Sequence, residues 1–165
     1  MEMIDIVNEK DEVIGQAAHE EIYSSFFNRR IVHVLVFNQK GEMAMQFRSK
    51  KKLFCPHHWS TAVVGHVQAG EEYEEAAKRE MFEEIGVNLN LEFFSKDTFR
   101  NPDQPDHIKF LSTYTAIHEG PFKINVEEVE KFDFFSLDQI QKMIDNKEKF
   151  HPELLFLLLK HFSIK

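Results

Sequence analysis

Short runs of apolar residues, broken by turn-forming residues, predict strands along most of this chain. Residues 31–37 are apolar and rich in β-branched side chains, and the Asn-Gln-Lys-Gly sequence at 38–41 predicts a turn into a hairpin partner at 42–47. Similar runs predict strands at 4–7, 59–66, 89–100, 108–117 and 129–135. A turn is predicted at 8–11 and a Pro-containing loop at 101–106.

Helices are predicted between and after these strands. Residues 72–85 hold many good helix formers, and Gly86 is a natural C-cap for them. A helical turn is predicted within 18–27, Ser136 is suited to cap a helix over 137–145, and Pro152 to open a last helix that ends near 162. Strands on both sides of a central helix indicate an α/β fold, with a mixed sheet covered on two faces. We expect the apolar run at 154–159 to pack in the core rather than to form a dimer contact.

The helix predicted at 72–85 carries a face of carboxylates. At about 100° per residue, Glu80, Glu83 and Glu84 share one face, while Met81 and Ile85 form an apolar stripe that would pack on a sheet. Three like charges at these spacings repel one another, and a hard divalent cation such as Mg²⁺ would remove that repulsion. A solvated acidic face is the alternative, and the helix taken alone favours it.

The residues around the helix favour the cation. A glycine-bounded loop precedes the helix, and such a loop lets backbone carbonyls approach a metal ion, which a solvated helix does not need. Arg79 lies close to Glu83 in helical angle and could orient it through a charged hydrogen bond.

Residues 65–87 match a known motif at every specified position. From Gly65 to Val87 the segment has the form G-x5-E-x7-R-E-U-x-E-E-x-G-U, in which U is apolar. The chain therefore resembles the Nudix hydrolases, which implies the Nudix fold, an α/β/α sandwich with a mixed β-sheet. The resemblance also implies metal-dependent hydrolysis, with Mg²⁺ or Mn²⁺, of a nucleoside or other diphosphate linked to another group. A non-catalytic binding module of the same fold is an alternative, but decayed modules usually lose carboxylates that this chain retains.

The resemblance assigns roles to individual residues. Glu80 and Glu84 are expected to be the principal metal ligands, with Glu83 as the third and the backbone carbonyl of Val64 as a further one. Glu71 is expected to support the site from the loop side. The expected catalytic set is Glu71, Arg79, Glu80 and Glu83.

Outside the motif, the segments DIVNEKDEVIG, RSKKK and HHWSTAVVGH resemble the isopentenyl-diphosphate isomerase branch of the superfamily. That isomerase has a catalytic cysteine where this chain has Val64, and two glutamates that align near His107 and Lys109. Arg29 stands where a histidine ligand would align. Valine cannot transfer a proton and lysine would repel a metal ion, so we predict a hydrolase and keep the isomerase as the alternative.

Two further pairs of residues are candidates for the site. Arg48 and Lys52 align with residues that hold the diphosphate in the isomerase branch, within a basic segment of a chain whose net charge is −8. A solvated basic loop is the alternative. Family members often recruit a general base from outside the motif, and Glu127 and Glu128 are the candidates here, with a plain surface turn as the alternative.

Composition and charge limit the number of domains, the binding partners and the cellular location that we expect for this chain. A chain of 165 residues, 42% of them apolar, fits one ordered domain over 1–165, and the net charge of −8 argues against binding a nucleic-acid polymer. Cys55 is the only cysteine, so no internal disulfide forms and a reducing compartment fits. The N-terminus lacks the features of a signal peptide, and no apolar run approaches the ~20 residues of a membrane span. We therefore expect a cytoplasmic monomer or homodimer that acts on a small molecule.

Overall fold

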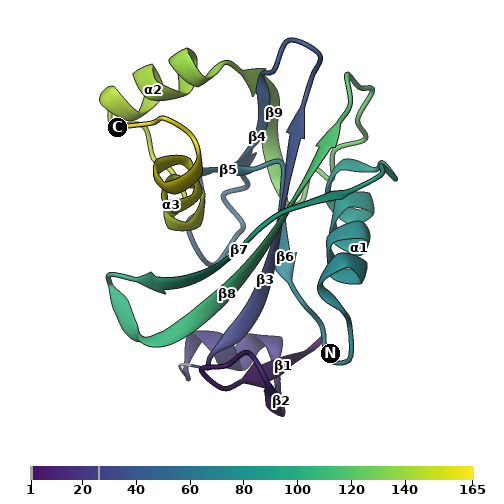
Figure 1. Cartoon of the computed structure of the whole chain (residues 1–165), viewed down its shortest axis with the longest axis vertical. Coiled ribbons are helices and arrows are strands. Elements are labelled where there is room, and N and C mark those ends of the chain that lie inside the picture. The colour runs from purple at the N-terminus through teal and green to yellow at the C-terminus, as the bar shows by residue number, and fades with distance from the viewer. Residues whose placement is uncertain (1, 26) are drawn as a thin grey trace.

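The computed structural model describes residues 2–25 and 27–165 (Figure 1). Its strands come in consecutive runs that are separated by helices, and two helices follow the last strand. In order they are β1 (Met3–Val7), β2 (Val13–Ala18), the 3₁₀ helix η1 (His19–Tyr23), β3 (Arg29–Phe37), β4 (Met43–Arg48), β5 (Trp59–Thr61), β6 (Val63–His66), α1 (Tyr73–Ile85), β7 (Glu92–Asn101), β8 (Gln104–Ile117), β9 (Val129–Phe135), α2 (Leu137–Asp145) and α3 (Pro152–His161).

A mixed sheet is built around β3. Along one edge β3 runs parallel to β8, from the pair Arg29↔Lys109 to the pair Phe37↔Ile117. Along its other edge β3 pairs first with β6 and then, at Phe37↔Met43, with β4, both antiparallel. The sheet continues to β5 and β9 beyond β4 and to β7 beyond β8, while β1 and β2 form a separate hairpin. The β3 strand therefore changes partner in its middle, and the sheet opens beside β6.

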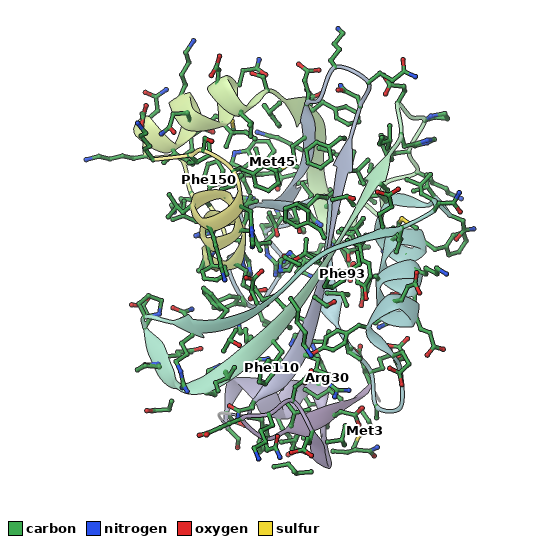
Figure 2. All side chains as sticks on the ribbon, viewed as in Figure 1. Met3, Arg30, Met45, Phe93, Phe110 and Phe150 are labelled. Atoms are coloured by element: carbon green, nitrogen blue, oxygen red, sulfur yellow. The ribbon has the colours of Figure 1, made fainter. Side chains whose placement is uncertain are left out.

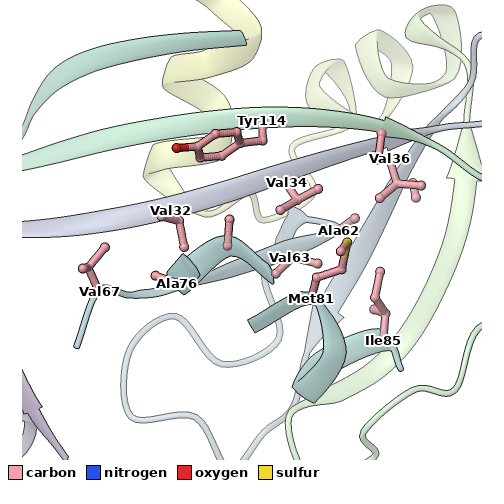
Figure 3. Close-up of a cluster of buried hydrophobic side chains, with 13 residues drawn as sticks. Val32, Val34, Val36, Ala62, Val63, Val67, Ala76, Met81, Ile85 and Tyr114 are labelled. Atoms are coloured by element: carbon pink, nitrogen blue, oxygen red, sulfur yellow. The ribbon is translucent and has the colours of Figure 1, made fainter. Parts of the chain in front are cut away.

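Helices cover both faces of this sheet (Figure 1). On one face, the buried side of α1 packs against valines of β3 and β6, in a cluster that includes Ala76, Met81 and Ile85 (Figure 3). On the other face, α2 and α3 enclose a second cluster, in which Figure 2 shows Met45 and Phe150 between the sheet and these helices. The predicted α/β/α sandwich with a mixed sheet is thus confirmed.

Alternation along the strands decides which side chains reach each face. On β3 the valines at 32, 34 and 36 join the α1 cluster, whereas Leu35 joins the α2–α3 cluster. The apolar run at 154–159 places Leu154, Leu157 and Leu158 in the core, as predicted, although Leu159 is 52% exposed.

Three local predictions need correction. The loop predicted at 101–106 is a tight hairpin, because Asn101 pairs with Gln104, and the register then shifts before Phe99 pairs with Lys109. The strand predicted at 59–66 is broken at Ala62, where the chain passes from β5 to β6. Strand β2 was not predicted, because its first residues are exposed and Gly15 interrupts its alternation.

The helical turn predicted within 18–27 is present as η1, and Phe26 lies outside the described residues. In the part of the chain that the structure describes, no helix has the length and apolar character to cross a membrane.

Candidate active site

The helix α1 sets the position of the carboxylates. Glu72 caps its first turn in a reciprocal pair with Glu75, and Gly86 ends it in the left-handed conformation with φ 67°. Because Met81 and Ile85 are fully buried against the sheet, neighbouring positions on the helix are drawn inward with them. Glu84 is consequently only 3% exposed.

Glu80 lies directly against the backbone of β6 at Gly65. A Cβ atom added to Gly65 would stand 2.2 Å from Cδ and 2.4 Å from Oε1 of Glu80, closer than any side chain tolerates. Gly65 does not adopt a left-handed backbone, so the contact with Glu80, and not φ, requires a glycine here. The first residue of the motif thus makes room for a carboxyl group of its helix.

Gln46 and Glu80 both hydrogen-bond to the carboxyl group of Glu84, and one of its oxygens has no partner. The side-chain amide of Gln46, on β4, donates to Oε1 of Glu84 at 2.8 Å. The second oxygen, Oε2, is buried and receives no hydrogen bond from the described protein. Burial raises the pKa of Glu84, and the charge of Glu80 raises it further.

Glu80 and Glu84 form a coupled pair. Burial raises the pKa of Glu80 to about 7, against the opposing effects of a hydrogen bond with Glu84 and the charge of Arg79. Two carboxyl groups this close share a proton readily, and ionising both leaves a concentrated negative charge.

Arg79 donates hydrogen bonds to four residues around this pair. Its guanidinium donates to both oxygens of Glu71, at 2.7 Å and 2.9 Å, and to Glu80 at 2.9 Å. It also donates to the carbonyl of His66 at 3.0 Å and to Glu83 at 3.2 Å. The predicted contact with Glu83 is therefore present, but Glu71 is the principal partner. Although burial opposes it, these hydrogen bonds lower the pKa of Glu71.

The carboxyl set suits a divalent cation but is not arranged around one point. Among residues 2–25 and 27–165, no three His, Cys, Asp or Glu side chains converge as metal ligands do. The Glu83 side chain is 51% exposed and turned toward Arg79. Nevertheless, hard carboxylate oxygens and the buried, unsatisfied Oε2 of Glu84 match the chemistry of Mg²⁺ or Mn²⁺. The role of the Val64 carbonyl stays a prediction.

A cleft of about 320 Å³ opens beside Gly65, and we call it the cationic cleft. It is bordered by β6 and the adjoining ends of β3 and β8, and by the loop of residues 49–58 and the start of α3. The charged side chains that line it are Arg29, Arg48, Lys51, Lys52, Lys109 and Glu153. The sequence predicted Arg48 and Lys52 near a phosphate, and both lie in this lining.

The two predicted phosphate contacts differ in their surroundings. Arg48 is buried, and its Nε and Nη2 donate to the carbonyls of Phe54 and Cys55 at 2.9–3.2 Å, so it shapes the 49–58 loop. Lys52 is partly exposed at the cleft, with its ammonium 3.7 Å from Glu128. Lys52 is therefore the better placed of the two to meet a ligand.

A buried ionic network forms the inner end of the cleft. Glu153, on α3, accepts from Lys109 at 3.0 Å and lies 2.9 Å from Nε2 of His33. The hydroxyl of Thr61 donates to the carbonyl of Val63, so Nδ1 of His33, 2.7 Å away, donates to Thr61. Burial opposes ionisation of Glu153, but Lys109 and the nearby histidines hold its pKa well below its usual range.

The structure distinguishes the two candidate bases. Glu127 pairs with Lys51 at the surface, where both side chains are more than 60% exposed. Glu128 is less exposed, pairs with Lys52, and lies close enough to Glu84 for its charge to raise the pKa of Glu84. Of the two, Glu128 adjoins the carboxyl pair.

The positions that depart from the isomerase pattern lie near one another. Arg29 and Lys109 are register partners on β3 and β8, and Nε of Arg29 donates to Nε2 of His66 at 3.1 Å. Burial lowers the pKa of His107 to about 4, and the charges of Arg29 and Lys109 lower it further. A neutral histidine and a cationic lysine thus stand where an isomerase would place carboxylates.

Sequence reasoning missed Gln46, His33 and Glu153. The one available signal was a polar residue within an apolar run, as for His33 in the strand at 31–37 and Glu153 directly before the leucine-rich run. Gln46 gave none, because amides are common on half-exposed strands.

Comparisons with known proteins agree with this geometry. Residues 27–158 match the NUDIX domain. An uncharacterized Nudix hydrolase of Pseudomonas aeruginosa is 31% identical over 134 residues, which cover 81% of this chain and 78% of that protein. The uncharacterized Nudix hydrolase YfcD of Escherichia coli is 29% identical over 93% of this chain and 83% of its own. The crystal structure of DR0079 from Deinococcus radiodurans superposes with a TM-score of 0.83 at 26% identity, covering 98% of this chain and 100% of that one.

Proposed function

This chain belongs to the Nudix hydrolase family, and we propose that it hydrolyses a diphosphate linkage in a small molecule with the aid of Mg²⁺ or Mn²⁺. One observation carries the metal assignment. Oε2 of Glu84 is buried, and no described residue donates a hydrogen bond to it. The carboxyl group of Glu80 lies beside it. Leaving such an oxygen unsatisfied is costly, and a divalent cation would satisfy it.

The family membership makes the chain a pyrophosphohydrolase, and its own residues then take specific tasks. In the proposal, Glu80 and Glu84 hold the cation together, and Glu83 turns from Arg79 to become the third ligand. The carbonyl of Val64 is proposed as a ligand from the strand side. When bound, the cation neutralises the diphosphate and lowers the pKa of the attacking water.

Arg79 acts in this proposal as a positioning residue. Its bonds to Glu71 and to the carbonyl of His66 fix the guanidinium, and the fixed guanidinium in turn orients Glu80. Glu71 therefore supports the site from the loop, two contacts away from the reacting atoms.

We assign the role of general base to Glu128. Water attacks one phosphorus atom, the bond from that phosphorus to the bridging oxygen breaks, and Glu128 accepts the proton that the water loses. The proximity of Glu128 to Glu84 supports this assignment, whereas Glu127 points to a surface lysine.

Isomerase chemistry is not supported by the site. The position of the required cysteine is Val64, and Lys109 is tied to Glu153 where an isomerase would need a carboxylate. A role as a binding module alone is also disfavoured, because no carboxylate of the motif is missing.

The proposal is tested by screening the purified protein with Mg²⁺ or Mn²⁺ against nucleoside triphosphates, dinucleotides, nucleotide sugars and coenzyme A. On the best substrate, Glu84→Gln should lower turnover by at least ~100-fold, since a metal contributes several kcal/mol to stabilising the transition state. Glu74→Gln is the matched control, because Glu74 lies on the same helix but is 55% exposed and pairs only weakly with Lys78. Full activity of Glu84→Gln, or in excess chelator, would reject the metal assignment.

A further inference from the structure

We propose that the cationic cleft binds a second phosphate group of the substrate, carried on the moiety that is linked to the diphosphate. This inference rests on the proposed hydrolase function and names its substrate class: diphosphates whose attached group bears its own phosphate monoester.

The charge of the cleft is opposite to that of the chain. Five cationic side chains line it, against one lining carboxylate, Glu153, and two carboxylates outside the lining, Glu127 and Glu128, which pair with Lys51 and Lys52. The cleft therefore keeps an excess of positive charge, although the whole chain carries a net charge of −8. An anion is the ligand that such a surface selects.

One histidine of the lining responds to this positive charge. Burial lowers the pKa of His151 to about 3, and the charges of Arg48, His33 and Lys109 contribute to that shift in spite of Glu153. The His151 ring therefore stays neutral beside a pocket whose cations are Arg and Lys.

The cleft and the carboxyl pair lie on opposite faces of β6. Gly65 faces Glu80 on the α1 side, so the side chains on either side of it, Val64 and His66, face the cleft. Lys109 stands on β8, two strand spacings or about 10 Å from β6, with β3 between them. A diphosphate held at Glu80 and Glu84 would therefore leave Lys109 to a different anionic group.

Lys109 is prepared for such a group. Its ammonium has three donors, of which Glu153 accepts one at 3.0 Å. The ring of Phe54 lies below it, 4.9 Å from the ammonium to the ring centroid. Glu153 thus fixes the ammonium without using all its donors.

Size and lining argue against a nucleobase in this cleft. Its volume of about 320 Å³ is near the lower end of ligand pockets. The phenyl ring in its lining, Phe54, already contacts the ammonium of Lys109 on its face and the ring of His151, edge to face, at 5.4 Å. A base that stacked on this ring would have to share it with both groups, whereas a phosphate on a small polar group would meet donors.

The cleft can be tested apart from the metal-dependent reaction by measuring the binding of inorganic phosphate in EDTA. Isothermal titration calorimetry gives the affinity. Lys52→Gln should weaken phosphate binding by about tenfold or more, as expected for a charged hydrogen bond. Lys50→Gln, in the same loop but outside the cleft lining, should leave it unchanged. Equal affinities of the wild type and Lys52→Gln, or no phosphate binding at all, would overturn the inference.

The inner end of the cleft is tested with a double variant. Lys109→Met alone would leave Glu153 buried without its lysine, so K109M/E153Q is the appropriate change. It should also weaken phosphate binding by tenfold or more. If it fails to fold, the comparison of Lys52→Gln with Lys50→Gln decides.

Turnover separates this inference from the proposed function. Coenzyme A and its 3′-dephospho form differ by one phosphate monoester, as do NADP⁺ and NAD⁺. The phosphorylated member should have the lower KM in at least one pair, and Lys52→Gln should remove this difference in KM. Phosphate binding without hydrolysis of any diphosphate would reject the hydrolase proposal alone. Hydrolysis without phosphate binding or preference for phosphorylated substrates would reject the cleft assignment alone.

Discussion

Replacing Gly65 with alanine would place a methyl group inside the Glu80 carboxyl. The three nearest atoms to the new Cβ all belong to Glu80, at 2.2 Å, 2.4 Å and 2.6 Å. Glu80 must therefore move, although it is bonded to Arg79 and its side chain is only 12% exposed. Overpacking of this kind costs about 1–3 kcal/mol, and the reduced freedom of the unfolded chain returns about 0.4–1 kcal/mol.

We therefore expect Gly65→Ala to lower the free energy of unfolding by about 1–2 kcal/mol. In a Glu80→Ala background the obstacle is gone, so the same substitution should become neutral or stabilising. Urea denaturation of the four proteins gives this coupling directly, provided that the m-value is unchanged. Gly15→Ala is the control, because nothing lies within 4 Å of its added Cβ.

Gly65→Ala should lower the catalytic activity more severely than the stability. A shift of about 1 Å in a catalytic group can cost about 100-fold, so Gly65→Ala should lower kcat/KM by roughly that factor while the protein remains folded. Equal losses of stability with and without the Glu80 side chain would refute the steric reasoning, because another contact would then be responsible.

Three further predictions concern the same site. In EDTA, the folded protein holds extra protons above pH 4.5, because burial raises the pKa of Glu80 from 4.5 to about 7 and also raises the pKa of Glu84, so the free energy of unfolding should fall by a few kcal/mol as the pH rises from 4.5 through 7; Glu80→Gln should reduce this slope in urea titrations at several pH values, and an unchanged slope would contradict the raised pKa. Glu128→Gln should lower kcat by about 100-fold or more if it is the base, whereas Glu127→Gln should change it less than about threefold; similar effects of both would remove the assignment. Isopentenyl diphosphate should not be isomerised, since Val64 replaces the cysteine, and an allylic product detected by NMR but absent with Glu84→Gln would overturn this.

The sequence predicted the parts of the fold whose signals are local. The helix at 73–85 follows from its helix formers and from Gly86, and the apolar runs located β3 and most of the sheet. The hairpin that joins β7 to β8 was missed because its polar residues are ordered by pairing across the turn, which no local pattern shows.

The site was predictable to the same extent. Helical spacing placed Glu80 and Glu84 together, but it also placed Glu83 with them, whereas the structure turns Glu83 toward Arg79. The cleft could not be predicted, since Lys109 and Glu153 are 44 residues apart and meet only because α3 packs on the sheet. Such long-range contacts depend on tertiary packing and leave no periodic signature.

The loop of residues 49–58, one wall of the cleft, is attached differently from the rest of the site. Lys51, Lys52 and His57 contact Glu127, Glu128 and Glu130 at partly exposed positions, and only Arg48 holds the loop from a buried position, through the carbonyls of Phe54 and Cys55, among the contacts described above. Exposed pairs contribute about 0–1 kcal/mol each, so the outer part of this wall can open locally while the sheet stays intact. Its amide hydrogens should therefore exchange with solvent far sooner than those of β3. An anion that bridges Lys52 to the sheet would slow that exchange. The bound ligand would then order the loop that encloses it.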